Sequence, residues 1–179
     1  MKTNVEDINR NIYDIKNADE YDFKMEKGLN REIVEEISRQ KNEPEWMLEI
    51  RLKALEMYNK LELPTWGPDL SELKMDEIAT YVRPKTKLNS NWDDVPDYIK
   101  ETFDKLGIPE AEQKSLAGVG AQYDSEVVYH SMKEDLIKQG VIYTDMESAV
   151  RDYPEIVKEH FMKCVPISDH KFVALHAAV

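Results

Sequence analysis

Apolar side chains recur every three or four residues between positions 28 and 63, and this spacing constrains the fold most because it places them on one face of an α-helix. Asn30 can cap a first helix that ends near Lys41. Its apolar stripe consists of Ile33, Val34 and Ile37. This face must be buried against another element of the chain.

A second and longer helix follows directly. Asn42 or Glu43 can cap it, and Pro44 suits its first turn. We expect this helix to run to about Leu63, with an apolar face formed by Met47, Ile50, Ala54, Tyr58 and Leu61. Two adjacent amphipathic helices therefore dominate the N-terminal half.

The segments around this helix pair are less regular. Residues 1–27 predict a polar arm, a short helix followed by an extended stretch, and residues 64–96 predict a loop with at most one short helix, because proline, glycine and asparagine are frequent there. Helical spacing returns in residues 96–106 and 109–117, and the second of these helices is expected to end at Gly118.

A small strand–helix–strand unit is expected in the C-terminal half. Residues 122–130 alternate and are rich in Val and Tyr, which indicates a strand, and residues 141–143 form a second, short one. Two capping boxes mark the expected helix starts, Ser131 with Glu134 and Thr144 with Glu147. The second helix continues or kinks at Pro154, and Asp169 can cap a last apolar segment, residues 172–179.

Together these elements predict an α+β fold that is mainly helical. We divide the chain into an arm (1–27), a helical region (28–118, with the loop at 64–96) and a small α+β region (119–179). The sequence stops while it is still apolar and shows no helix C-cap.

Composition excludes several classes of partner. The 24 Lys and Arg residues against 36 Asp and Glu give a net charge of −12, which repels nucleic acid and anionic membranes. The apolar runs are far shorter than the roughly 20 residues that span a bilayer. A single cysteine cannot form an internal disulfide, and no secretion signal is recognisable, so we expect a cytoplasmic protein.

Few residues could carry chemistry. His160 and Cys164 are four positions apart, so a helix could place them on one face, where His160 could activate the thiol. The apolar residues around Cys164 suit a buried, inert cysteine equally well. With His170 and His176 these residues match no zinc-binding spacing. We therefore expect no catalytic, cofactor-binding or metal-binding residue, and no enzymatic activity.

The remaining polar and aromatic groups have simple structural interpretations. His130 fits a surface position at the end of a strand, adjacent carboxylates usually face solvent, and tryptophans in an acidic protein favour core or interface packing over base stacking. The residues concerned are Glu35, Glu36, Asp93, Asp94, Trp46, Trp66 and Trp92.

Several motifs occur in the order found in one known family. They are Gly28-Leu29-Asn30, the stretch from Asn42 to Ala54 that contains Asn-Glu-Pro-Glu-Trp-Met, residues 102–118, residues 123–129, residues 136–142 and residues 169–175. Over about residues 21–179 the chain resembles the N-terminal region of SufB in the SufB/SufD family of scaffold subunits for bacterial iron–sulfur cluster assembly.

This resemblance implies a function and partners. Subunits of the family work with SufD and the ATPase SufC, and an iron–sulfur cluster is built on the full-length scaffold. A long right-handed parallel β-helix follows the N-terminal region, then a helical region that docks the ATPase, and the cluster-binding and sulfur-accepting residues lie in those parts. The resemblance therefore implies no site residue here, and a structural, positioning role.

Three features depart from the family pattern or vary within it. Cys164 stands where the family usually has a small residue, and His176 replaces a usual asparagine, and neither resembles a ligand. Residues 81–91 contain no cysteine, whereas some relatives carry a cysteine cluster in this loop.

Two other functions remain open from the residues. The chain could be an independent acidic adaptor that regulates the same machinery by competing for a partner surface, or a thiol-based sulfur carrier that uses Cys164 with His160. If the chain exists alone, a surface suited to packing on the β-helix would be exposed, and we then expect self-association.

Overall fold

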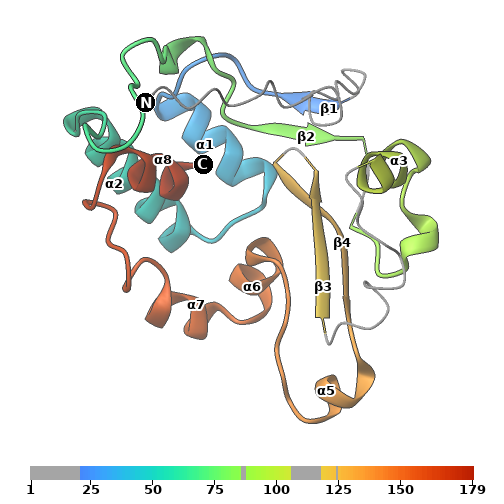
Figure 1. Ribbon diagram of the computed structural model, residues 1–179. Helices are drawn as coiled ribbons and strands as arrows, with labels where there is room; N and C mark the ends of the chain where they lie inside the picture. The colour runs from blue at the N-terminus through green and yellow to red at the C-terminus, as the bar shows by residue number, and fades with distance from the viewer. Residues whose placement is uncertain (1–20, 86–87, 106–117, 124) are drawn as a thin grey trace, which may run out of the picture. The chain divides into compact units, whose positions relative to one another are not determined.

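A computed structural model describes residues 21–85, 88–105, 118–123 and 125–179 (Figure 1). Within them lie seven α-helices and two small two-stranded sheets, which confirms the mainly helical α+β prediction. The chain forms two compact units. We call Phe23–Arg83 with Thr144–Val179 the helical unit, and the one that contains Pro84–Tyr143 the hairpin unit. No helix in the described ranges is long and apolar enough to cross a membrane.

Helix α1 (Arg31–Gln40) forms as its sequence predicts. The side chain of Asn30 accepts a hydrogen bond of 2.8 Å from the backbone N–H of Ile33, and the predicted stripe is buried. The chain then turns at Asn42, whose φ of 51° lies in the left-handed region that asparagine tolerates. The first helix and its cap are thus confirmed.

Helix α2 (Glu45–Lys60) is confirmed, but its predicted ends are wrong. Pro44 is the N-cap and no side chain caps the helix, because the Glu43 carboxylate binds Arg51 instead. The helix ends three residues before Leu63, where Leu61 turns to an extended conformation. Met47, Ala54 and Tyr58 of the predicted face are buried.

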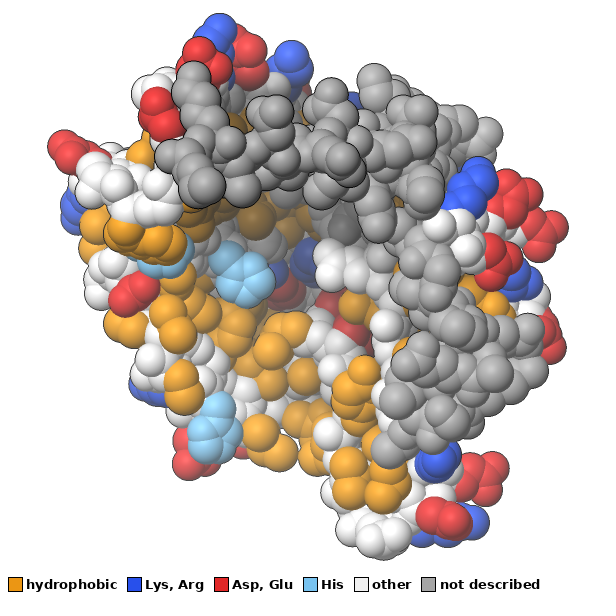
Figure 2. All heavy atoms as spheres, viewed as in Figure 1, with side chains coloured by type: hydrophobic (Ala, Val, Ile, Leu, Met, Phe, Trp, Pro, Cys, Tyr) orange, Lys and Arg blue, Asp and Glu red, His pale blue; other side chains and the backbone are white. Residues whose placement is uncertain are grey.

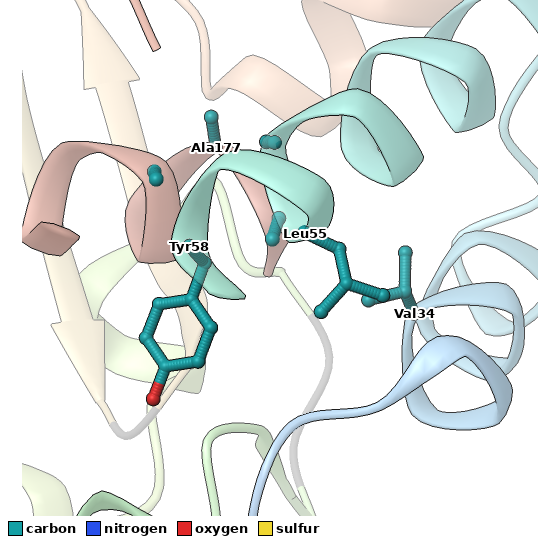
Figure 3. Close-up of a cluster of buried hydrophobic side chains, with 7 residues drawn as sticks. Val34, Leu55, Tyr58 and Ala177 are labelled. Atoms are coloured by element: carbon teal, nitrogen blue, oxygen red, sulfur yellow. The ribbon is translucent and has the colours of Figure 1, made fainter. Parts of the chain in front are cut away.

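Helix α8 (Lys171–Ala178) packs against α2 and accounts for the apolar end of the sequence. Ala174, Ala177 and Ala178 are each at most 1% exposed in a cluster with α2, and Figure 3 shows Leu55 pointing toward Val34 of α1 in the same cluster. His170 rather than Asp169 caps this helix, because its Nδ1 accepts the Phe172 N–H at 3.2 Å.

Helices α6 (Met146–Asp152) and α7 (Pro154–His160) complete the helical unit. The predicted break at Pro154 is confirmed, since this proline opens α7. The predicted Thr144 cap is wrong, because Asp145 accepts the Ser148 N–H at 2.8 Å. Val150 and Val157 from these helices are buried with Met47 of α2. The segment after residue 143 therefore shares a core with the N-terminal helices, which differs from the sequence-based division at residue 118.

The predicted strand at residues 122–130 is instead part of a hairpin. Strands β3 (Gly118–Tyr123) and β4 (Glu126–Met132) pair antiparallel, with an irregularity in register between Ala121 and Gln122. Such an irregularity breaks strict alternation, and Val128 and Tyr129 are both buried as a result. Helix α3 (Asp97–Lys105) covers this core through Ile99.

Two further expectations for this region are wrong. Ser131 cannot cap α5 (Glu134–Lys138) because it pairs with Val119 inside β4, and Lys133 precedes the helix instead. Residues 141–143 form no strand. Gly118 opens β3, and the predicted helix at 109–117 lies outside the described residues.

The loop predicted at residues 64–96 contains only short elements among its described residues. These are the 3-10 helices η2 (Met75–Glu77) and η3 (Trp92–Asp94) and strand β2 (Val82–Pro84). Strand β2 pairs with β1 (Tyr21–Lys24), so the end of the predicted arm is extended, whereas the rest of that arm lies outside the described residues.

The contact between α2 and α8 yields a first prediction. Replacing the buried Ala177 by Leu overfills this contact and should lower the free energy of unfolding by about 1–3 kcal/mol. His176→Leu, at the exposed neighbouring position of the same helix, should change it by less than about 0.5 kcal/mol. Chemical denaturation of both variants checks this. Equal effects would show that α8 does not pack on α2 through its alanines.

Candidate functional site

A buried ion pair fixes the C-terminal end of α8. The Arg51 guanidinium binds both carboxylate oxygens of Glu43, at 2.7 Å and 2.6 Å, and its third nitrogen donates to the carbonyl oxygen of Val179 at 2.6 Å. The side chains of Arg51 and Glu43 are only 7% and 3% exposed. This bidentate geometry suits a guanidinium, and a lysine side chain would not reproduce it.

A lysine fixes the other end of the same helix. Lys171 donates from Nζ to the carbonyl oxygens of Tyr58 and Leu61, at 2.8 Å and 2.9 Å, and lies 4.2 Å from the centre of the Tyr58 ring. Burial, and then the charge of Asp76, raises the pKa of the Tyr58 hydroxyl. Lys171 thereby satisfies carbonyls left unpaired at the end of α2.

These contacts make α8 an anchored element and not a reaction centre. Its start lies at the end of α2, and its end reaches back to Arg51 in the middle of α2, so the two helices run in opposite directions. The charged groups involved are committed to each other or to backbone carbonyls. We call Arg51, Glu43 and Lys171 the α8 anchor.

The structure does not bring the predicted chemical candidates together. Helix α7 ends at His160, and Cys164 is an exposed free thiol in the turns that follow, so the helical spacing that would join them is lost. His170 caps α8, and His176 lies on an exposed position of that helix. Across the described residues, no cluster of three or more His, Cys, Asp or Glu side chains is placed to hold a metal ion.

The acidic and aromatic candidates serve the fold or face solvent. Glu35 pairs with Arg31, Glu36 accepts from Gln40, and both residues of the Asp93–Asp94 pair are exposed in η3. Two of the tryptophans pack within cores, and Trp66 is 66% exposed. The Nζ atom of Lys158 lies 5.4 Å from the centre of the Trp46 ring. Trp92 contacts the rings of Phe103 and Tyr129 edge-on. The Trp66 ring is edge-on to His170, with 5.5 Å between the ring centres.

An exposed apolar strip on the hairpin unit was not predicted as such. Figure 2 shows hydrophobic side chains gathered over α5 and the segment that follows it. We define the 137–143 strip as Ile137, Val141, Ile142 and Tyr143, which are 55%, 45%, 49% and 42% exposed. The strand predicted at residues 141–143 would bury part of this strip, whereas the structure leaves all four side chains exposed.

Backbone hydrogen bonds and ring contacts hold parts of the 137–143 strip. Gly140, with a φ of 84°, ends α5. Its N–H donates to the carbonyl oxygen of Ile137, and the Val141 N–H donates to the carbonyl oxygen of Leu136. This pair of hydrogen bonds is a Schellman motif. The Tyr143 ring lies so close to β3 that a Cβ on Gly118 would come within 3.0 Å of it. His130 of β4 stacks on the same ring at 5.1 Å and bonds the Tyr143 carbonyl through Nε2.

Comparison with known sequences identifies the family. The family model described as SufBD protein N-terminal region matches residues 29–179. The chain belongs to the SufBD family. It is 52% identical over all 179 residues to the iron–sulfur cluster assembly protein SufB of Bacillus subtilis, and 55% identical over 157 residues to an iron–sulfur cluster assembly SufBD family protein of Staphylococcus aureus.

The match covers most or all of this chain but only part of each relative. The chain spans 38% of the Bacillus subtilis relative, and the matched segment covers 34% of the Staphylococcus aureus relative and 88% of this chain. The resemblance inferred from the ordered motifs is thereby confirmed at the level of the family. Both the α8 anchor and the 137–143 strip lie inside the matched region.

The α8 anchor generates a second prediction. Arg51→Met leaves the Glu43 carboxylate buried without a partner and should lower the free energy of unfolding by about 3–5 kcal/mol. Adding Glu43→Leu should recover much of this loss, because the unpaired buried charge is then removed. Arg31→Met, at an ion pair 65% and 45% exposed, should cost less than about 1 kcal/mol. Similar losses for Arg51→Met and Arg31→Met in denaturant unfolding would contradict the anchor.

Proposed function

We propose that this chain is the N-terminal structural domain of a SufB-like scaffold subunit in the cytoplasm, and that it assembles with SufC and SufD through the full-length protein. Its role is positioning, and it has no catalytic residue or resident cofactor of its own. The iron–sulfur cluster is cargo that other parts of the subunit bind. Family membership and the share of the relatives that the chain covers support this proposal.

The α8 anchor is the observation that carries the positioning role. Helix α8 lies at the far end of the matched region and is fixed at both ends, by Arg51 and Lys171. A helix held at both ends defines the direction in which a following segment leaves, because it has little freedom to pivot. A positioning domain needs such a rigid exit, whereas a catalytic domain needs converging reactive groups.

Two alternative functions can be tested on the same native protein. An independent adaptor would use the acidic surface of this chain alone, and it is favoured by the net charge of −12. A sulfur carrier would use Cys164, which is exposed and therefore reachable by a partner. The first alternative requires that the native protein end near residue 179, and the second that its thiol react faster than an ordinary one.

The intact mass of the native protein, followed by its co-purification with SufC and SufD, tests the proposal. We expect a mass well above the 20.9 kDa of this chain and recovery of both partners in one complex. A native mass near 20.9 kDa would overturn the proposal and leave the adaptor function. In that case the chain should self-associate, which light scattering across concentration would detect.

The exposed thiol generates a third prediction. Cys164→Ser should leave iron–sulfur cluster formation on the full-length complex unchanged, because Cys164 has no metal-binding cluster around it among the described residues. Iodoacetamide should alkylate Cys164 no faster than the cysteine of a short unstructured peptide under the same conditions. Loss of cluster formation in the variant, or alkylation much faster than in that peptide, would favour the sulfur carrier. Ser148→Ala is a control substitution away from the thiol.

A further inference from the structure

Trp66 is the most exposed large hydrophobic side chain among the described residues, at 66%. It lies in the loop between α2 and η2, where the next residue, Gly67, turns the chain with a φ of 90°. Tryptophan is among the residues that contribute most to protein–protein binding. A single exposed apolar side chain is nevertheless ordinary, so the role of Trp66 depends on the groups around it.

The Trp66 ring is held on one side by the cap of α8. The His170 ring meets it edge-on, and His170 is itself fixed because its Nδ1 accepts the Phe172 N–H at 3.2 Å. A ring nitrogen that accepts a hydrogen bond carries no proton, so this imidazole adds no positive charge beside the indole. Trp66 is therefore partly oriented while most of its surface remains in solvent, which reduces the entropy lost on binding.

The loop that contains Trp66 is negatively charged. Residues 61–73 include Glu62, Asp69 and Glu72 and no lysine or arginine. All three acidic residues are exposed, and none of them forms an ion pair with a lysine or arginine in the part of the chain that the structure describes. We call residues 61–73 the Trp66 loop.

Two carboxylates beside this site are fixed. The Asp69 carboxylate accepts the Ser71 N–H at 2.9 Å, and this hydrogen bond lowers the pKa of Asp69. Oδ2 of Asp169 lies 3.7 Å from Nε2 of His170, whose ring contacts Trp66. Lys171 follows closely along the chain, but it donates to carbonyl oxygens at the end of α2. The exposed indole is thus accompanied by acidic groups that are available to a partner.

This combination favours a cationic partner, and arginine in particular. The face of an indole ring carries negative partial charge and attracts cations, arginine more often than lysine. A guanidinium can stack on the ring and donate to a carboxylate with two nitrogens at once, which an ammonium group cannot do. The net charge of −12 attracts such a partner at long range.

We propose that the Trp66 loop is a docking site for an arginine side chain of a partner protein. The guanidinium stacks on the exposed indole of Trp66, and the acidic groups beside it accept its hydrogen bonds. His170 is a positioning residue, because it holds the indole and does not contact the partner. The inference is independent of the proposed scaffold role, since it rests only on residues of the helical unit.

The affinity of the full-length protein for a labelled peptide of four Gly-Arg repeats tests the inference by fluorescence anisotropy. Trp66→Ala should weaken binding by about two- to fivefold, and Trp66→Phe by less, because phenylalanine retains an aromatic face. The same peptide with lysine in place of arginine should bind at least about twofold more weakly. A peptide with citrulline, the neutral analogue of arginine, should not bind.

Two triple variants with the same change in net charge separate the loop from the general field of the protein. The first neutralises the three carboxylates of the Trp66 loop and should weaken binding by about threefold or more. The second neutralises three exposed carboxylates of the hairpin unit and should have a clearly smaller effect. The substitutions are Glu62→Gln, Asp69→Asn and Glu72→Gln in the first variant, and Asp93→Asn, Asp94→Asn and Asp97→Asn in the second.

Four results would overturn the inference. Equal affinity for the arginine and lysine peptides, or equal losses in the two triple variants, would show a general negative surface only. Unchanged affinity in Trp66→Ala would show that the indole is not the contact, as when another part of the full-length subunit covers it. Binding of the citrulline peptide would assign the loop to a neutral partner. None of these results affects the native mass or the recovery of SufC and SufD, which test the proposed function separately.

Discussion

The packing of α8 on α2 is the contact on which the helical unit depends. It joins residues 171–178 to residues 45–60 across most of the sequence, and three alanines allow the two helices to approach closely. Charged side chains fix the contact at each end, Arg51 at Val179 and Lys171 at the last turn of α2. Without this contact, the α1–α2 pair would expose a long apolar face.

The same contact explains why the chemical candidates are dispersed. Arg51 and Glu43 carry opposite charges, but they are buried together and Arg51 binds the end of α8. His170 is used as a cap, and Cys164 is left in an exposed turn. Polar groups with structural partners are less available for catalysis, in keeping with the positioning role proposed for this chain.

The two units differ in how their apolar residues are used. In the helical unit the large buried side chains come from α1, α2 and the segment after residue 144. In the hairpin unit part of the apolar content is turned outward, in the 137–143 strip, and is held there by glycine and histidine contacts. The helical unit therefore buries its large apolar side chains against one another, whereas the hairpin unit leaves part of its apolar surface exposed.

The sequence alone determined the local elements and the family. Asn30, the stripe at Ile33 to Ile37 and Pro154 act through neighbours within one helical turn, so helix α1 and the break before α7 could be predicted. The ordered motifs sufficed to identify the SufB/SufD family. Tertiary structure decided what depends on residues farther along the chain: the hairpin at 118–132, the partner of Glu43 and the burial of α8. These outcomes result from long-range competition for hydrogen bonds and buried area, which local spacing does not encode.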